Sequence, residues 1–242
     1  MLNIFVTATD SNIGKTFISA GLAATMQSLG YSTCVYKPIQ TKAPSKNGFA
    51  QSPDLLYVKN VDPYIKTRST YLLKENASPL IAAEMENVFI DHTLIKKEIE
   101  ACCKESDCLI TEGTGGLMTP VSINLSVSDL IKKLELPTLI IVNPQTSSIN
   151  QILLTIQHAQ LKGLLLSGVV INNLPEETSD IDTKSCPRLI EEYTDAKVLG
   201  IVKQFSDPKN INPNDLITSI LNGIDIESVF NVKIAKLNLD LD

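Results

Sequence analysis

The sequence predicts an α/β protein with a doubly wound, mainly parallel sheet flanked by helices. Short apolar runs recur along the chain without polar alternation, as in strands that are covered on both faces. Amphipathic segments separate these runs, and this alternation is typical of right-handed crossovers in a parallel sheet. The length of 242 residues suits one domain over residues 1–242.

Six apolar runs are the predicted strands: residues 2–7, 32–37, 108–111, 137–143, 166–172 and 196–202. Predicted helices cover residues 15–29, 91–104, 126–136, 149–161 and 186–194, and a helix-like segment begins at Asp54. The polar loop 40–50 is long for a simple connection, so we expect it to be functional. The chain after about residue 224 follows the last predicted strand. It is read as an added strand or helix, or as a C-terminal extension that binds a partner.

Composition excludes several classes of function. The net charge is −6 and the pI about 5.0, which argues against a general DNA- or RNA-binding surface. The N-terminus does not have the pattern of a signal peptide, and no apolar run reaches the length of a membrane span. Five cysteines without zinc-type spacing are read as reduced thiols, and the two histidines as ordinary surface or core residues. We therefore expect a cytoplasmic protein with no nucleic-acid or membrane partner.

A nucleotide-binding loop is predicted between the first strand and the first helix. The sequence there is Ala-Thr-Asp-Ser-Asn-Ile-Gly-Lys-Thr, from Ala8 to Thr16. Gly14 lets the backbone approach phosphates, whose charge is favoured by the helix N-terminus that follows. Lys15 is expected to reach the terminal phosphates, and the Thr16 hydroxyl to bind Mg²⁺. Ala8 stands where the first glycine of such loops usually lies.

Charged residues at the carboxyl ends of two strands are expected in the same crevice. Glu112 follows an apolar strand and precedes a Gly-Thr-Gly-Gly run, which suits Mg²⁺ or phosphate chemistry. Lys37 ends the second predicted strand, although a lysine there is often only solvated. Asp54 follows Pro53 at a helix start, and from the residues alone it is an ordinary first-turn acid.

Together these segments resemble the dethiobiotin synthetase family of the P-loop NTPase superfamily. The matching motifs occur in family order over about residues 1–205. They are T-A-T-D-S-N-I-G-K-T, Y-K-P-I-Q-T, S-P-D, S-P-L-I-A-A, T-E-G-T-G-G, S-I-N and G-V-V-I-N-N. The resemblance implies an enzyme that uses ATP to join CO₂ to 7,8-diaminononanoate through a carbamate and a carbamic–phosphoric anhydride. Its products are dethiobiotin, ADP and phosphate.

The resemblance also implies roles for individual residues. Lys37 and Lys15 are the implied catalytic residues. The implied Mg²⁺ ligands are Thr16, Asp54 and Glu112. The implied substrate-binding residues are Lys37, Thr41, Ser148 and Asn150. The nucleotide is expected to contact Asn12, Ile13, Gly14, Lys15, Thr16, Phe17, Asp54, Glu112, Gly113, Thr114, Gly115, Asn172 and Asn173, with Asn172 reading the adenine edge.

The family is a homodimer, so the resemblance implies that residues 147–151 receive the substrate carboxylate from the other subunit. The chain departs from the family at Ala8, at Asn12 where many members carry Glu, and at Lys203-Gln204-Phe205. Many members have a proline-containing segment along the adenine at this last position. The nucleotide preference is therefore left open.

Two alternatives belong to other functional classes. Partitioning and septum-positioning ATPases share the fold, but they carry an additional lysine early in the phosphate loop that residues 8–11 lack. A catalytically silent paralogue used for binding would have no physical need to keep Lys15, Thr16, Lys37, Asp54 and Glu112 together.

Overall fold

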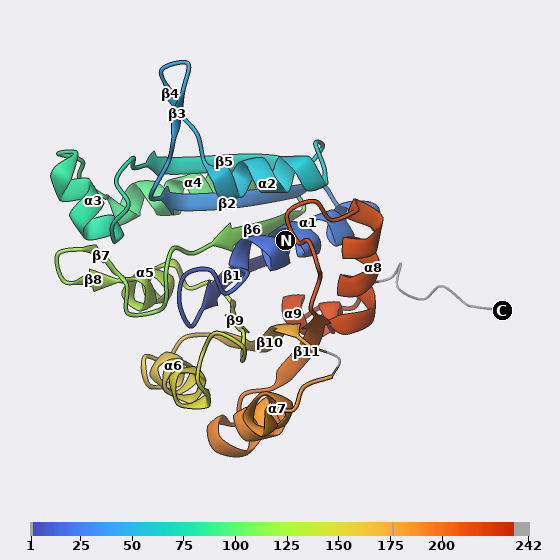
Figure 1. Ribbon diagram of the computed structural model, residues 1–242. Coiled ribbons are helices and arrows are strands. Elements are labelled where there is room, and N and C mark those ends of the chain that lie inside the picture. Colours follow the sequence, from blue (N-terminus) through green and yellow to red (C-terminus); the bar gives the residue numbers. More distant parts are fainter. Residues whose placement is uncertain (1, 176, 235–242) are drawn as a thin grey trace.

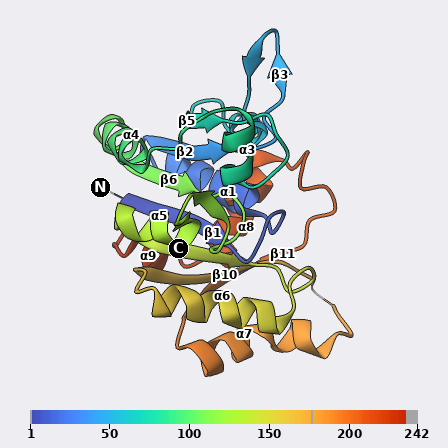
Figure 2. The same ribbon diagram turned by 90° about the vertical axis from the view of Figure 1, so that its left-hand side faces the viewer.

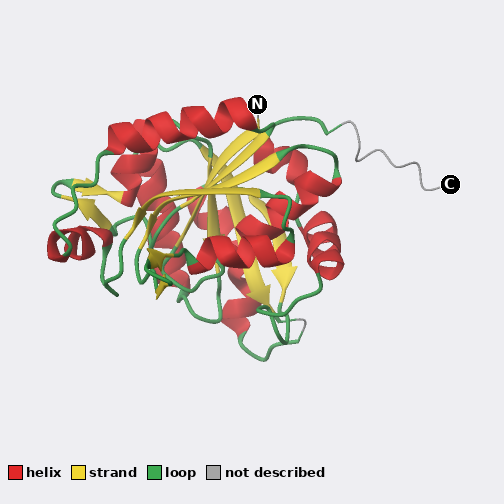
Figure 3. Cartoon of the chain, turned by 90° about the horizontal axis from the view of Figure 1, so that it is seen from above, coloured by secondary structure: helices red, strands yellow, loops and turns green. Residues whose placement is uncertain are grey.

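The computed structural model describes residues 2–175 and 177–234, which form a parallel sheet between two layers of helices (Figures 1 and 3). The strand order is β11-β10-β9-β1-β6-β2-β5, and the neighbouring strands pair in parallel. The doubly wound fold is therefore confirmed. No helix in the described part of the chain combines the length and apolar character needed to cross a bilayer.

All six predicted strands form. They are β1 (Leu2–Ala8), β2 (Thr33–Gln40), β6 (Cys108–Glu112), β9 (Thr138–Val142), β10 (Leu166–Leu174) and β11 (Val198–Lys203). Each of the five central strands buries consecutive residues, as expected for strands covered on both faces. The seventh strand, β5 (Lys66–Leu72), was not predicted. It lies at the sheet edge and its sequence is mostly polar, so it lacks the apolar signal.

The helices of the two layers pack on opposite faces of the sheet. One apolar cluster joins the sheet to α1 (Lys15–Ser28), α2 (Pro53–Val61), α8 (Pro213–Gly223) and α9 (Ile226–Phe230). A second cluster covers the other face and includes α3 (Pro79–Met85), α4 (His92–Glu105), α5 (Val127–Leu134), α6 (Ile149–Leu161) and α7 (Ile181–Thr194). Figure 2 shows α6 and α7 stacked beside β10. Helices α3 and α8 were not predicted, and α9 lies where an added helix was one of the alternatives for the chain after residue 224.

Two expected segments differ in detail, and one further hairpin was not predicted. Helix α7 begins at Ile181 rather than at residue 186, because the Asp180 side chain accepts hydrogen bonds from two amides of the first turn. The polar loop contains a small hairpin, β3 (Ser45–Lys46) and β4 (Phe49–Ala50). A second hairpin, β7 (Pro120–Ser122) and β8 (Leu125–Ser126), follows the glycine run.

The chain after residue 224 begins as part of the core. Ile226, Val229 and Phe230 of α9 are buried against the sheet. Residues 235–242 lie outside the described residues, so the expected C-terminal extension and the one-domain organisation stay predictions.

Candidate active site

The phosphate loop joins β1 to α1 and turns sharply at Gly14. Gly14 is the N-cap of α1 and has φ 105°, a left-handed conformation that glycine adopts without a Cβ clash. A Cβ at this position would lie 2.0 Å from Nδ2 of Asn172. That amide donates a hydrogen bond of 2.9 Å to the Ile13 carbonyl oxygen. Strand β10 therefore braces the phosphate loop at the point where only glycine fits.

Lys15 lies across the loop instead of pointing into solvent. Its Nζ donates to the carbonyl oxygens of Asp10, at 2.7 Å, and Gly115, at 2.8 Å. Burial, followed by the positive charge of Lys37, lowers the pKa of Lys15 to about 8. An anionic phosphate beside this ammonium would favour its charged form, so the site is suited to polyphosphate.

Lys37 lies at the centre of a compact charge cluster toward the carboxyl ends of β2 and β6. Strand β2 continues to Gln40, so Lys37 lies within the strand and does not end it as predicted. Its Nζ is 2.8 Å from Glu112 Oε1 and 2.7 Å from Asp54 Oδ2, and it also donates to the Gly113 carbonyl oxygen. Lys37 and Glu112 are almost completely buried, with exposed fractions of 3% and 1%. Burial alone would lower the pKa of Lys37, but the two facing carboxylates outweigh it and raise the pKa.

Two members of this cluster differ from what their positions in the sequence predicted. Lys37 is not a solvated strand end, because it is held by two carboxylates. Asp54 is in the first turn of α2, as expected of an ordinary acid, yet its carboxylate faces the crevice. The N-cap is Ser52, whose Oγ accepts from the Leu55 amide. That cap leaves the Asp54 carboxylate available to Lys37.

The residues predicted to hold Mg²⁺ fit a hard divalent cation. The Thr16 hydroxyl donates to Glu112 Oε1 at 2.7 Å, and Glu112 Oε2 is buried without a hydrogen-bond partner. Within residues 2–175 and 177–234, no group of three or more His, Cys, Asp or Glu side chains is arranged for a metal. Mg²⁺ does not need one, since it binds through one or two carboxylates together with waters and substrate phosphates.

A pocket of about 560 Å³ opens over these groups. Its wall contains most of the predicted residues, namely Asn12, Gly14, Lys15, Thr16, Phe17, Lys37, Thr41, Asp54, Glu112, Thr114 and Gly115. Several other lining residues were not predicted: Ser11, Gln40, Lys42, Pro53, Tyr57, Asn76, Pro208 and Lys209. Tyr57 follows Asp54 by one helical turn, so the helical period of α2 could have identified it.

The remaining predicted residues lie elsewhere. Ile13 is buried under the loop, and Gly113 lies behind the pocket wall. Asn172 binds the Ile13 carbonyl, while Asn173 has φ 62° and accepts a hydrogen bond from Gln145 at its carbonyl oxygen. Ser148 and Asn150 line a different pocket of about 210 Å³ at the start of α6. A single chain therefore does not bring these last two residues to Lys37.

An aromatic contact and a hydrogen bond connect the loop after β11 to the nucleotide pocket. The Phe17 and Phe205 rings are tilted, with centroids 5.6 Å apart. The Tyr57 hydroxyl donates to the Pro208 carbonyl oxygen at 2.6 Å. Phe205 lies in the segment where the sequence departs from the family, so an aromatic ring here occupies the position of the expected proline-containing segment.

Comparison with known proteins identifies the family of the chain. A family model described as an AAA domain matches residues 2–211. The ATP-dependent dethiobiotin synthetase BioD of Bacillus licheniformis is 30% identical, over 96% of this chain and 97% of its own length. The same enzyme of Methanocaldococcus jannaschii is 32% identical, over 84% of this chain and 95% of its own length.

A likeness to a solved structure supports the fold alone. The MinC:MinD cell division protein complex of Aquifex aeolicus aligns with a TM-score of 0.55 and 15% identity, covering 95% of this chain and 94% of that chain. The sequence relatives are more specific, because they match nearly end to end. The chain belongs to the AAA domain family matched here and, within it, to the ATP-dependent dethiobiotin synthetases.

Proposed function

We propose that this chain uses ATP and CO₂ to close the ureido ring of dethiobiotin on 7,8-diaminononanoate. The observation that carries the proposal is the cluster of buried Lys37 and Glu112 with half-buried Asp54, beside Lys15 at the end of the phosphate loop. A buried lysine between two carboxylates at the phosphate end of a nucleotide pocket suits transfer of a phosphoryl group to an anionic acceptor.

The reaction proceeds in three steps. One amine nitrogen bonds to the carbon of CO₂ and loses a proton, which gives a carbamate. A carbamate oxygen then bonds to the γ-phosphorus as the bond to the bridging oxygen of ADP breaks. The second amine attacks the carbamoyl carbon, phosphate leaves with the electron pair of the broken C–O bond, and loss of a proton completes the ring.

The protein contributes position and charge to these steps. Lys15 is assigned to the terminal phosphates, where its ammonium neutralises charge. Lys37 is assigned to the carbamate and the phosphoryl group in transfer. Thr41 lies on the pocket wall close to Lys37 in the chain, and its hydroxyl is assigned to the substrate.

Thr16, Asp54 and Glu112 would hold Mg²⁺, which supplies charge neutralisation at the phosphates when bound. Glu112 Oε1 already accepts hydrogen bonds from Lys37 and Thr16, and Oε2 is the oxygen left for a cation. Asp54 is the more exposed carboxylate, so it can turn from Lys37 toward a cation or its water shell.

We also propose a homodimer in which Ser148 and Asn150 of one subunit receive the substrate carboxylate bound in the other. The α6 N-terminus offers backbone amides that suit a carboxylate. Helix α3 packs against strand β7 of the hairpin β7–β8. Exposed apolar side chains on and beside these elements are suited to subunit contact: Ile81, Met85, Phe89, Met118 and Ile123. A cytoplasmic location agrees with the five unbonded cysteines.

The decisive experiment is an ADP-release assay with purified protein. ADP is expected only when diaminononanoate, CO₂ and MgATP are all present, with dethiobiotin formed in equal amount. Repeating the assay with GTP, CTP and UTP measures the nucleotide preference. ATP hydrolysis that DNA stimulates, without any need for the diamine, would favour a partitioning ATPase instead. Nucleotide binding without turnover would favour a silent paralogue.

A further inference from the structure

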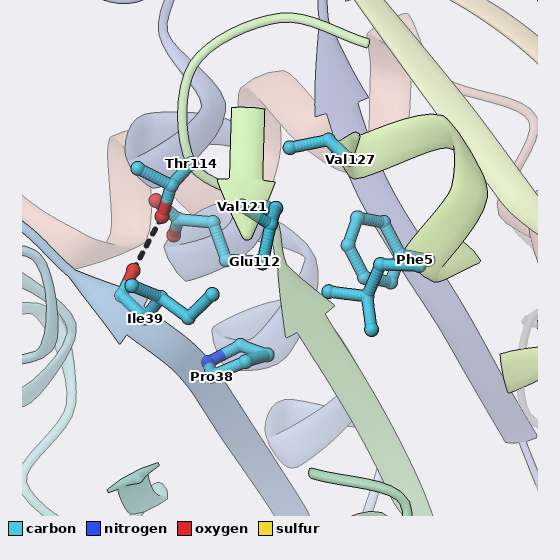
Figure 4. A pocket seen from close by; sticks show the side chains of 9 residues that line it. Phe5, Pro38, Ile39, Glu112, Thr114, Val121 and Val127 are labelled. Carbon is cyan, nitrogen blue, oxygen red and sulfur yellow. Dashed lines mark hydrogen bonds between the residues drawn. The ribbon is translucent and has the colours of Figure 1, made fainter. Parts of the chain in front are cut away.

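A second, much smaller pocket lies directly behind Glu112 (Figure 4). Its wall combines β1, β2 and β6 with the hairpin β7–β8 and α5. The lining residues are Phe5, Pro38, Ile39, Glu112, Gly113, Thr114, Val121, Val127 and Leu130. Five of these are buried apolar side chains of the same core cluster. The pocket is therefore a local gap in that core at the edge of the active site.

The space suits one small uncharged molecule. About 10 Å³ is available to the centre of a water-sized molecule, and the surrounding empty space, including the part that opens to solvent, is about 250 Å³. Such a volume holds about one molecule of that size. CO₂ is a narrow, linear molecule whose cross-section is close to that of water, so its width suits this space.

The wall is unfavourable for water. A buried water needs two to four polar partners. Only two lining side chains are polar, and the Thr114 hydroxyl already donates to the Ile39 carbonyl oxygen. Glu112 Oε1 accepts from Thr16 and Lys37, so a wall residue offers water at most one unpartnered side-chain oxygen, Glu112 Oε2, which is fewer than the two to four partners required.

The small pocket adjoins the position assigned to the carbamate. Glu112 and Thr114 line both this pocket and the larger nucleotide pocket. The Lys37 Nζ donates to the Gly113 carbonyl oxygen at 2.9 Å, and Pro38 of the wall is the next residue in the chain. A molecule leaving the pocket toward the crevice would therefore emerge beside Lys37.

We propose that this pocket is the binding site of CO₂ before the carbamate forms. The inference rests on the proposed function. CO₂ carries no charge and no net dipole, so the charged crevice offers it little, whereas an apolar recess retains it next to the reacting amine. Holding it there replaces a collision from dilute solution by a positioned encounter. The amine nitrogen then bonds to carbon, a C=O electron pair moves to oxygen, and the amine proton leaves to solvent.

The kinetic test fills the pocket by one methylene at a time. Val121→Ile and Val127→Ile each add volume to the wall without adding a polar atom. We expect the KM for CO₂ to rise about 5-fold or more because the site is obstructed, while kcat at saturating CO₂ and the KM values for ATP and the diamine stay unchanged. Val142→Ile is the matched control, since Val142 is buried in the same core cluster but lines neither pocket.

A direct measurement covers the case in which the filled variants do not fold. Crystals of the wild-type protein pressurised with CO₂ should show linear density between Val121, Val127 and Glu112. A spherical density bonded to Glu112, or none, overturns the proposal. An unchanged KM for CO₂ in folded variants also overturns it, and indicates that carbamate formed in solution is the true substrate. If the wild type shows no CO₂-dependent ADP release, the proposed function itself fails.

Discussion

The two ends of the nucleotide pocket are built in different ways. At the phosphate end, Lys15, Lys37 and Glu112 are buried and held by hydrogen bonds and ion pairs from several segments of the chain. At the end where β11 leads into the following loop, Gln204 is exposed and Phe205 half-buried, and the loop is held by the Phe17 ring and the Tyr57 hydroxyl.

This difference explains where the chain keeps the family pattern and where it departs. A buried charge must have its partners, so replacing one member of the phosphate-end cluster leaves another charge uncompensated. An exposed loop carries no such constraint, and its sequence can change at little cost. We therefore expect substitutions at the phosphate end to have much larger effects than substitutions at the loop end.

Lys37→Ala is the substitution with the largest expected effect. Dethiobiotin formation should fall by about 10³-fold or more, because the charge assigned to the transferring phosphoryl is lost. In metal-free buffer the free energy of unfolding should also fall, by about 3–5 kcal/mol, since Glu112 is left buried without its cation. The product assay and urea unfolding measure the two effects.

Lys59→Ala is the control for Lys37→Ala. Lys59 lies on α2, and its Nζ donates a hydrogen bond at the surface to the Pro63 carbonyl oxygen. Lys59→Ala should change neither dethiobiotin formation nor the free energy of unfolding appreciably. Normal turnover by Lys37→Ala would contradict the assigned mechanism.

Gly14→Ala tests the junction between the two ends. A residue other than glycine at φ 105° costs about 1–3 kcal/mol, and the new Cβ would displace Asn172 from the Ile13 carbonyl. We expect that loss of stability together with an ATP affinity that is about 10- to 100-fold weaker. This weakening corresponds to about 1.4–2.8 kcal/mol of binding free energy.

Gly48→Ala separates backbone strain from steric conflict in this test. Gly48 has φ +82° and nothing within 4 Å of its missing Cβ. Gly48→Ala should lower the free energy of unfolding in urea because of backbone strain. Its ATP affinity, measured by calorimetry, should not change. Equal ATP affinities for Gly14→Ala and wild type would show that the loop does not need glycine there.

The sequence was most informative where a charged residue follows a buried apolar run. Apolar runs predicted the central strands, and Lys37 and Glu112 were noticed because they end such runs. The contact of Lys37 with Asp54 was not predictable from spacing, because it depends on how α2 packs beside β2. Strand β5 was missed because tertiary pairing at the sheet edge outweighs its polar sequence. Asn76 and Pro208 line the pocket from loops, which carry no periodic signal.

Asn172→Ala should have an intermediate effect. Removing the Nδ2 donor leaves the buried Ile13 carbonyl oxygen without this hydrogen bond, at a cost of about 1 kcal/mol in unfolding free energy. Loss of the amide assigned to the adenine edge should also reduce discrimination between ATP and GTP, measured as the ratio of the two kcat/KM values. Asn214→Ala, at an exposed position on α8, is the control. An unchanged ratio would remove Asn172 from base recognition.

Phe205→Ala should have the smallest effect and most sharply tests the contrast between the two ends. The contact between the Phe17 and Phe205 rings is worth about 0.5–1.5 kcal/mol, so the KM for ATP should rise only a few-fold while kcat is unchanged. Tyr64→Ala removes an exposed ring outside the proposed subunit contact and should leave the KM for ATP unaltered. If Phe205→Ala instead lowered kcat as strongly as Lys37→Ala, the loop after β11 would have to order the phosphate end. The two ends would then form one cooperative site.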